Sequence, residues 1–274
     1  MTWRDWLDQA EKRLIDSGDM DARIDAEWML CDALQIGRGA LRFALDEQTN
    51  GAALTQADIW LQRRMSGMPL QYAQRRAYFM GHEFYVDERV LIPRQDTERL
   101  AETAIELAKA RGYHTALDLC TGSGAIGIAL KLALPDMSVL ATDLSGDAIA
   151  VAQENAKRLD ADVEYMQGDL FAALDDRKFD LIVSNPPYIN ERDMANLQPE
   201  VRREPEMALA GGTDGLSFYR RIAADYQHHL NPKGALLLEI GYDQGAAVSG
   251  LLGEGAFLKQ DLGGNDRLVG YIQI

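Results

Sequence analysis

Cysteine is scarce in this sequence of 274 residues, which argues against a fold held together by disulfides. The two cysteines, Cys31 and Cys120, lie in unrelated segments, one in a helical pattern and one at the end of an apolar run. Both are therefore predicted to be reduced, buried thiols. The four histidines show no metal-ligand spacing, so the sequence predicts no metal site.

Long apolar runs are lacking as well. No segment approaches the ~20 apolar residues of a membrane-spanning helix, and residues 1–6 lack the apolar core of a signal peptide. We expect a cytoplasmic protein without membrane contacts. Basic residues are outnumbered, with 28 Lys and Arg against 43 Asp and Glu and a net charge of −15. Because nucleic-acid affinity rests on Lys and Arg contacts to phosphates, we expect no direct nucleic-acid binding.

Hydrophobic residues make up 47% of the chain, enough for a sizeable core in one domain plus a smaller one. Through residues 1–72 they recur at helical spacing, beginning with the stripe from Trp3 to Leu14, and predict a small helical bundle. Thr2 and Thr55 each precede an aspartate by three residues, which matches a capping box at a helix start.

Residues 73–93 carry aromatic and β-branched positions around Met80-Gly81-His82, and predict a β-hairpin linker. Residues 94–274 alternate between helical and strand patterns, which predicts an α/β fold with a Rossmann-like sheet. Helices are expected near 96–110, 125–134 and 145–159, and a further buried strand at 235–240. Segments 257–262 and 267–274, joined by a glycine-rich turn, predict a C-terminal antiparallel hairpin.

A glycine loop stands between a predicted strand and a predicted helix. The apolar run 115–120 is followed at once by a loop in which Gly122, Gly124 and Gly127 form G-x-G-x-x-G. Asp143 ends the next apolar run, at the distance expected for an acid that binds ribose hydroxyls. Glycines let the backbone approach a ligand, and the helix N-terminus offers N–H groups to a carboxylate or phosphate. The pattern suits any adenosine cofactor.

One further acid separates the possible cofactors, and another belongs to the predicted adenine pocket. Asp118 stands just before the glycine loop, where its charge would repel a pyrophosphate but attract an ammonium or sulfonium group. It therefore favours S-adenosylmethionine over a dinucleotide. Asp169 follows another strand pattern and can accept a hydrogen bond from the exocyclic amine of adenine, while Leu170 or Phe171 covers the ring.

The segment Asn185-Pro186-Pro187-Tyr188 follows the apolar run 179–184 and suits the binding of a planar NH2 group. The prolines restrict the backbone and make the loop stiff. Two carbonyl oxygens, from the Asn185 side chain and the Pro186 backbone, can accept hydrogen bonds, and Tyr188 offers a flat aromatic face. Because this loop and the three acids all fall at the ends of predicted strands, we expect them to gather at one edge of the sheet.

With these motifs in order, the sequence resembles class I S-adenosylmethionine methyltransferases that act on planar nitrogen. Further segments resemble the peptide chain release factor glutamine methyltransferases, the HemK/PrmC family, over nearly the whole chain. Gln95 stands where that family commonly has proline, and Leu170 where it often has tryptophan. The segments are Pro69-Leu70-Gln71-Tyr72, Phe79-Met80-Gly81-His82-Glu83-Phe84, Val90-Leu91-Ile92-Pro93-Arg94-Gln95-Asp96-Thr97-Glu98, Glu204-Pro205 with Ala208-Leu209, Gly211-Gly212-Thr213-Asp214-Gly215-Leu216 and Gly264-Asn265-Asp266-Arg267.

The resemblance implies methylation of the glutamine side-chain amide in the Gly-Gly-Gln motif of bacterial release factors, with S-adenosylmethionine as methyl donor. It makes Asn185, Pro186 and Tyr188 the predicted catalytic residues, and these three with Pro187 the predicted substrate-binding residues. It also implies that the helical bundle recognises the protein substrate. The residues predicted to bind the cofactor are Asp118, Cys120, Thr121, Gly122, Ser123, Gly124, Asp143, Leu144, Asp169, Leu170, Phe171 and Asn185.

Other functions fit parts of the sequence. A glutamine methyltransferase of a ribosomal protein would use the same loop, and so would an amino-methyltransferase of adenine in DNA, although the net negative charge opposes a DNA substrate. A dinucleotide-dependent oxidoreductase accounts for the glycine loop and Asp143. It leaves Asp118 and the Asn-Pro-Pro-Tyr segment unexplained. A non-catalytic adaptor would leave both loops without a purpose.

Overall fold

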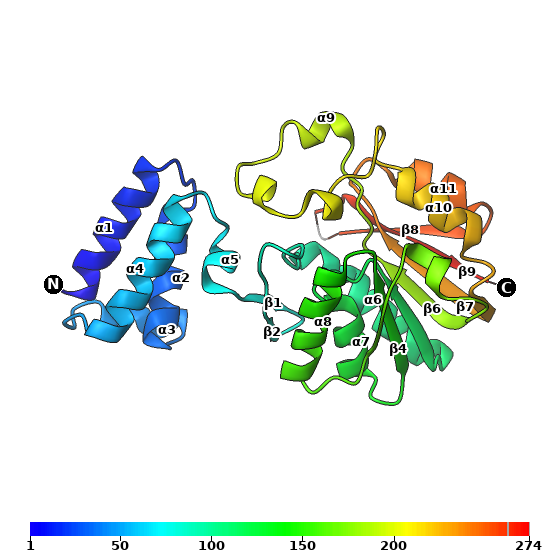
Figure 1. The fold of residues 1–274 in the computed structure, drawn as a ribbon, viewed down its shortest axis with the longest axis horizontal. Helices are drawn as coiled ribbons and strands as arrows, with labels where there is room; N and C mark the ends of the chain where they lie inside the picture. The colour runs from blue at the N-terminus through cyan, green and yellow to red at the C-terminus, as the bar shows by residue number, and fades with distance from the viewer. Residues whose placement is uncertain (262, 274) are drawn as a thin grey trace. The chain divides into compact units, whose positions relative to one another are not determined.

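The computed structural model describes residues 1–261 and 263–273. The chain divides into two compact units. The helical unit consists of Met1–Arg75 and the short segment Pro199–Arg203, and the sheet unit consists of Arg76–Gln198 and Glu204–Ile274 (Figure 1). The segment Pro199–Arg203 therefore packs with residues that precede it by more than a hundred positions, a pairing that nothing in the sequence patterns indicated.

The helical unit is built from amphipathic helices. Its core contains Trp3, Trp6 and Leu14 of the predicted stripe. No helix in the described part of the chain is both long and apolar enough to cross a membrane. The helices are α1 (Trp3–Asp16), α2 (Ala22–Leu34), α3 (Arg38–Ala44), α4 (Gly51–Met65) and α5 (Leu70–Gln74), and the segment Pro199–Arg203 adds the 3-10 turn η2 (Val201–Arg203).

One of the two predicted capping boxes forms. The Thr2 hydroxyl accepts a hydrogen bond from the Asp5 backbone N–H at 3.2 Å, and the Asp5 carboxylate accepts from the Thr2 N–H at 2.7 Å. The box predicted at Thr55 is wrong. Helix α4 begins one turn earlier because Asn50 caps the Ala53 N–H at 3.0 Å, and Thr55 lies inside the helix, where its hydroxyl donates to the Gly51 carbonyl.

The sheet unit begins with the predicted hairpin, in which β1 pairs with β2. Its seven-stranded sheet has the order β5-β4-β3-β6-β7-β9-β8. The elements are β1 (Ala77–Phe79), β2 (His82–Phe84), α6 (Gln95–Arg111), β3 (Thr115–Leu119), α7 (Ala125–Ala133), β4 (Ser138–Asp143), α8 (Gly146–Arg158), β5 (Glu164–Gln167), η1 (Leu170–Ala173), β6 (Phe179–Ser184), α9 (Glu191–Met194), η3 (Glu206–Ala208), α10 (Ser217–Asp225), β7 (Leu230–Glu239), α11 (Gly245–Leu252), β8 (Ala256–Gln260) and β9 (Asp266–Ile272).

The predicted α/β fold is confirmed. Strands β5, β4, β3, β6 and β7 are parallel, and β9 pairs antiparallel with both β7 and β8. Helices α6, α7 and α8 match their predicted ranges within one residue. Strand β7 starts five residues before its predicted start at Ala235. The predicted C-terminal hairpin forms as β8 and β9, and its predicted end residues Leu262 and Ile274 lie outside the described residues.

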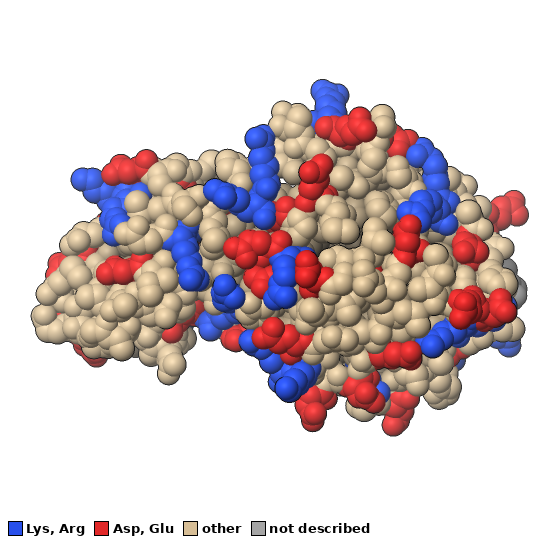
Figure 2. Space-filling view, viewed as in Figure 1, with Lys and Arg blue, Asp and Glu red and all other residues tan. Residues whose placement is uncertain are grey.

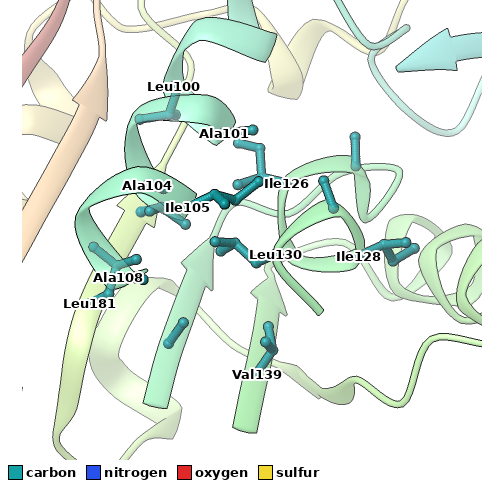
Figure 3. Close-up of a cluster of buried hydrophobic side chains, with 14 of the residues drawn as sticks. Leu100, Ala101, Ala104, Ile105, Ala108, Ile126, Ile128, Leu130, Val139 and Leu181 are labelled. Carbon is teal, nitrogen blue, oxygen red and sulfur yellow. The ribbon is translucent and has the colours of Figure 1, made fainter. Parts of the chain in front are cut away.

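Helices cover both faces of the sheet (Figure 1). Helices α6, α7 and α8 lie on one face, and Figure 3 shows how Leu100, Ala104 and Ile105 of α6 pack with Leu130 of α7 and Val139 of β4. Helices α10 and α11 cover the other face through a second apolar cluster. Because strands buried on both faces have few polar positions, polar side chains are left for the strand ends, where the candidate site lies.

Candidate active site

The strand order changes direction at β3, in the centre of the sheet, because β4 lies on one side of β3 and β6 on the other. Ligands bind in such sheets at the carboxyl ends of the strands beside this reversal. A cavity of about 230 Å³ lies there, within the sheet unit. The predicted residues that line it are Cys120, Thr121, Gly122, Ser123, Asp143, Leu144, Asp169, Leu170, Asn185 and Pro187. The predicted residues that do not line it are Asp118, Gly124, Phe171, Pro186 and Tyr188.

Asp143, the last residue of β4, holds the glycine loop in place. Its Oδ2 accepts from the Gly122 backbone N–H and its Oδ1 from the Ser145 N–H, both at 2.9 Å. Burial raises the pKa of this carboxyl group, although the backbone donors oppose the change. Each carboxylate oxygen can accept a second hydrogen bond. Asp143 can therefore organise the loop and still accept from the hydroxyl groups of a ligand.

Asp118 lies behind the glycine loop and not on the cavity wall. It is fully buried, and its Oδ2 accepts from the Thr121 hydroxyl at 2.6 Å and the Gly127 N–H at 2.9 Å. A Cβ at Gly127 would stand 3.0 Å from the same oxygen, so a larger residue here would crowd the Asp118 carboxylate. The other oxygen, Oδ1, is buried without a hydrogen-bond partner among the described residues. Burial raises the pKa of Asp118 to about 7.

The segment after β5 separates Leu170 from Phe171. Leu170 lines the cavity in the left-handed backbone conformation, with φ at 51°. Phe171 turns into the core and stacks on His229 with ring centroids 4.8 Å apart. Asp169 lines the cavity and forms an ion pair with Arg221 at 2.8 Å. Of the two side chains predicted to cover adenine, Leu170 is the one on the cavity wall.

The Asn-Pro-Pro-Tyr loop begins directly after β6. The side-chain Nδ2 of Asn185 donates to the Thr97 hydroxyl of α6 at 3.1 Å. Its Oδ1 accepts no hydrogen bond from the described residues, so the acceptor end of the amide is available to a ligand. The two prolines are buried, which keeps this acceptor on a rigid loop.

Tyr188 is held by several neighbours. Its hydroxyl lies 3.5 Å from Glu239 Oε1, and its backbone carbonyl accepts from Gln244 Nε2 at 3.0 Å. Gly215 has a positive φ of 75°, and a Cβ there would stand 2.4 Å from the same carbonyl. Gly215 belongs to the segment 211–216, one of those that resemble the family. This segment therefore packs directly on the Asn-Pro-Pro-Tyr loop.

Part of the cavity wall lies outside the motifs that follow the predicted strands. Arg94 lines it and is paired with the buried Glu204, whose carboxylate also accepts from the Ile92 N–H. Apolar side chains, among them Met207 and Phe218, complete the wall. From the sequence we expect Arg94 to shape the mouth of the site, whereas Glu204 is noticed only as part of a segment that resembles a family, because it follows none of the predicted strands.

The residues present fit S-adenosylmethionine. Gly122 lines the cavity, and a Cβ built there would meet nothing within 4 Å, so its backbone faces open space as a ligand-binding glycine should. Beside it, Asp143 has unused acceptor capacity for hydroxyl groups. Burial raises the pKa of the Cys120 thiol, so this cysteine stays a neutral wall residue. Among the residues that the structure describes, no group of three or more His, Cys, Asp or Glu is placed to hold a metal ion.

Comparisons with known proteins agree with this arrangement. The family model "Methyltransferase small domain" matches residues 99–245, and "PrmC N-terminal domain" matches residues 5–73. Two solved structures share the fold. These are the T. thermophilus 16S rRNA N2 G1207 methyltransferase in complex with AdoMet and guanosine, with a TM-score of 0.52, 19% identity, and coverage of 73% of this chain and 50% of that one, and a Pyrococcus furiosus methyltransferase, with a TM-score of 0.52, 17% identity, and coverage of 81% and 100%.

Full-length relatives are much more similar. The release factor glutamine methyltransferase of Geobacter sulfurreducens is 42% identical over 98% of this chain and 96% of its own length. That of Moorella thermoacetica is 42% identical over 97% of each chain. The matches span both the helical and the sheet unit, and they agree with the methyltransferase fold in the family that they indicate. The chain belongs to the release factor glutamine methyltransferase family of class I S-adenosylmethionine-dependent methyltransferases.

Proposed function

We propose that this protein methylates the side-chain amide nitrogen of the glutamine in the Gly-Gly-Gln motif of peptide chain release factors, using S-adenosylmethionine. The observation that carries the proposal is the Asn185 amide. Its donor end, Nδ2, donates a hydrogen bond to Thr97, and its acceptor end, Oδ1, accepts none from the described residues. The Asn185 side chain lines the cavity, as does Asp143, an acid of the type that binds ribose hydroxyls. Relatives 42% identical over nearly the full chain carry the name of this activity.

An amide nitrogen is a poor nucleophile because its lone pair is delocalised into the carbonyl. The site must therefore orient the NH2 group and stabilise the positive charge that grows on the nitrogen. Asn185 Oδ1 and the Pro186 carbonyl are neutral acceptors on a rigid loop, and their hydrogen bonds to the NH2 group strengthen as its protons become more acidic. The nitrogen gains a methyl group and loses one proton to water. No strong general base is required.

S-adenosylmethionine supplies an electrophilic methyl group when it is bound. The residues that would hold it are those of the cavity wall. Asp143 would accept from the ribose hydroxyls, and Leu170 would cover the adenine. Gly122 would allow the close approach of the backbone. Asp118 would act from behind the loop by fixing Thr121 and Gly127 through its hydrogen bonds.

Charge distribution separates the alternative substrates. On the face shown in Figure 2, Lys and Arg side chains lie scattered among Asp and Glu side chains, in a chain with a net charge of −15. Such a surface does not favour DNA, whose binding depends on clustered basic residues. A ribosomal protein remains the nearest rival substrate, since the same loop would hold any glutamine amide.

The test is mass spectrometry of a bacterial release factor incubated with this protein and S-adenosylmethionine, beside a ribosomal-protein extract and DNA. We expect one added methyl group on the Gly-Gly-Gln glutamine. Asn185→Ala is expected to lower turnover by about 100-fold, because it removes an acceptor used in the transition state. Asn196→Ala is the matched control, since among the described residues that exposed side chain bonds only the Arg192 carbonyl.

Two results would contradict the proposal. Methylation of a ribosomal protein or of adenine, with the release factor unmodified, would overturn the substrate. Normal turnover in Asn185→Ala would overturn the role given to the loop. Affinity for S-adenosylmethionine, measured by calorimetry, should change little in either variant, because the proposed role of Asn185 is mainly to hold the glutamine.

A further inference from the structure

The side chain of Gln244 joins three pieces of backbone at the end of the Asn-Pro-Pro-Tyr loop. Its Nε2 donates to the Tyr188 carbonyl at 3.0 Å and to the Gly215 carbonyl at 3.3 Å. Its Oε1 accepts from the Gly241 N–H at 2.9 Å. The residue is 9% exposed and stands at the start of α11. The loop, the glycine-rich segment 211–216 and the residues after β7 therefore meet at one buried amide.

These hydrogen bonds allow only one orientation of the Gln244 amide. Both N–H groups of Nε2 are used on carbonyl oxygens, and the Gly241 N–H can only donate. If the amide were flipped by 180°, its NH2 group would face the Gly241 N–H, and its oxygen would face the carbonyls of Tyr188 and Gly215. Donor would then meet donor and acceptor would meet acceptor. The amide therefore holds the Tyr188 carbonyl in one direction.

The glycine-rich segment lies against the loop with no room for side chains between them. A Cβ at Gly211 would stand 2.7 Å from the Tyr188 Cα, and a Cβ at Gly215 would stand 2.4 Å from the Tyr188 carbonyl oxygen. Ordinary van der Waals contacts begin at 3.4 Å, so a methyl group at Gly215 would displace this carbonyl by about 1 Å. Two backbone hydrogen bonds complete the contact, from the Ile189 N–H to the Leu209 carbonyl at 2.9 Å and from the Gly211 N–H to the Ile189 carbonyl at 2.8 Å.

The Asn-Pro-Pro-Tyr loop is thus held at both ends. At its start, Asn185 follows β6 directly and donates to the Thr97 hydroxyl at 3.1 Å. At its end, Gln244 and the glycine-rich segment hold Tyr188. Between the ends, the prolines restrict φ and leave the backbone few other conformations. The direction of the Pro186 carbonyl therefore depends on both attachments.

We propose that Gln244 and the glycine-rich segment act as positioning residues that set the direction of the Pro186 carbonyl and, through it, the orientation of the NH2 group to be methylated. This inference rests on the proposed function, in which that carbonyl accepts from the glutamine. Gln244, Gly211 and Gly215 do not line the cavity, so their effect must pass through the loop. A displacement of about 1 Å near the reacting atoms can lower a rate about 100-fold.

The first experiment compares Gly215→Ala with Gly112→Ala. Both glycines have a positive φ, 75° and 67°, so alanine introduces a similar backbone strain at each. A Cβ at Gly112 would meet nothing within 4 Å. At saturating release factor and S-adenosylmethionine, we expect Gly215→Ala to lower kcat about 100-fold and Gly112→Ala to match wild type. Calorimetric affinity for S-adenosylmethionine should change less than about threefold in both variants.

Gln244→Met tests the amide without a steric clash. Methionine keeps the length of the side chain and removes all three hydrogen bonds. We expect kcat to fall about tenfold, because the Tyr188 carbonyl loses its restraint while the glycine contact remains. Gln260→Met is the matched control, since among the described residues the Gln260 amide donates only to Asp266, at 3.1 Å. If Gly215→Ala does not fold, Gln244→Met decides the result.

Hydrogen exchange of backbone amides provides a readout that needs no substrate. The N–H groups of Ile189 and Gly211 form the contact between the loop and the glycine-rich segment. They should exchange at least about tenfold faster in Gln244→Met than in wild type, and at the wild-type rate in the control variant. The Thr121 N–H in the glycine loop, which donates to the Thr142 carbonyl at 2.9 Å, is the internal reference and should not change.

Three results would overturn the inference. One is full kcat in a folded Gly215→Ala or in Gln244→Met. Another is an unchanged exchange rate of the Ile189 and Gly211 amides in Gln244→Met. The third is a large loss of affinity for S-adenosylmethionine with full kcat at saturation, which would mean that the segment serves the cofactor. If wild type transfers no methyl group to release factor, the proposed function fails, and hydrogen exchange still decides whether Gln244 holds the loop.

Discussion

The two units treat buried charge in opposite ways. In the helical unit, Arg64 of α4 is 8% exposed and is surrounded by carboxylates, with Asp25 at 2.5 Å, Asp19 at 3.0 Å and Glu200 at 3.1 Å. In the sheet unit, Asp118 and Glu239 are buried at the strand ends without an ion pair among the described residues.

In the helical unit, buried charges join structural elements, whereas in the sheet unit, buried acids lie at the candidate site. The Arg64 cluster joins α2, α4 and the segment Pro199–Arg203 within one unit, and its single cation forms ion pairs with all three carboxylates. The two unpaired acids instead hold hydroxyl and backbone N–H groups beside the cavity, at a cost in stability that proteins accept at functional sites. Variants can test whether this contrast is real.

The largest effect is expected from Arg64→Met. It removes the cation and leaves buried carboxylates unpaired, which costs about 3–5 kcal/mol of unfolding free energy. All four tryptophans, Trp3, Trp6, Trp28 and Trp60, lie in the helical unit, so their fluorescence during urea unfolding reports on that unit. Arg38→Met is the control, because the side chain of Arg38 is 49% exposed in its ion pair with Glu27 and should cost less than about 1 kcal/mol. Equal losses of unfolding free energy in Arg64→Met and Arg38→Met would show that the buried cluster stabilises the protein no more than an exposed ion pair does.

A smaller, pH-dependent effect is expected from Asp118→Asn. The pKa of Asp118 rises from an ordinary value of 3.8 to about 7 in the folded protein. Between these values the folded chain keeps a proton that the unfolded chain has lost, so wild-type stability falls as pH rises through this window. The asparagine variant lacks this loss. The unfolding free energy of the variant minus that of wild type should therefore be larger at pH 8 than at pH 4, by about 1–3 kcal/mol.

Thermal unfolding followed by circular dichroism at a series of pH values measures this difference. Asp136→Asn, at an exposed position, serves as the control. A stability difference between Asp118→Asn and wild type that does not depend on pH would mean that Asp118 is charged at every pH, and that the hydrogen bonds from Thr121 and Gly127 outweigh its burial.

The smallest effect is expected from Arg221→Ala. Its ion pair with Asp169 lies beside the cavity, but the two side chains are 49% and 45% exposed. Exposed pairs are weak and screened by salt, so the unfolding free energy should change by less than about 0.5 kcal/mol. Calorimetric affinity for S-adenosylmethionine is the more sensitive measurement, because Arg221 restrains Asp169. A loss of stability as large as that of Arg64→Met would show that exposure does not set the strength of these pairs.

Much of the site was predictable because it is local in sequence. The glycine loop, Asp143 and Asn185 each follow a strand pattern, and parallel strands bring their carboxyl ends to one edge. The same reasoning could not separate Leu170 from Phe171, since the stacking of Phe171 on His229 joins residues 58 positions apart. It also placed Asp118 at the ligand, although the side chain turns behind the loop to bond Thr121 and Gly127.

The sequence by itself determined the order of helices and strands, the stiff Asn-Pro-Pro-Tyr loop and the family, because periodicity, proline geometry and motif spacing act over short stretches of chain. Only the tertiary structure decided that Thr97 meets Asn185 across 88 residues and that Glu200 joins Arg64 in the helical unit. Such contacts depend on the packing of whole elements, and burial then sets the hydrogen bonding and pKa of each polar side chain.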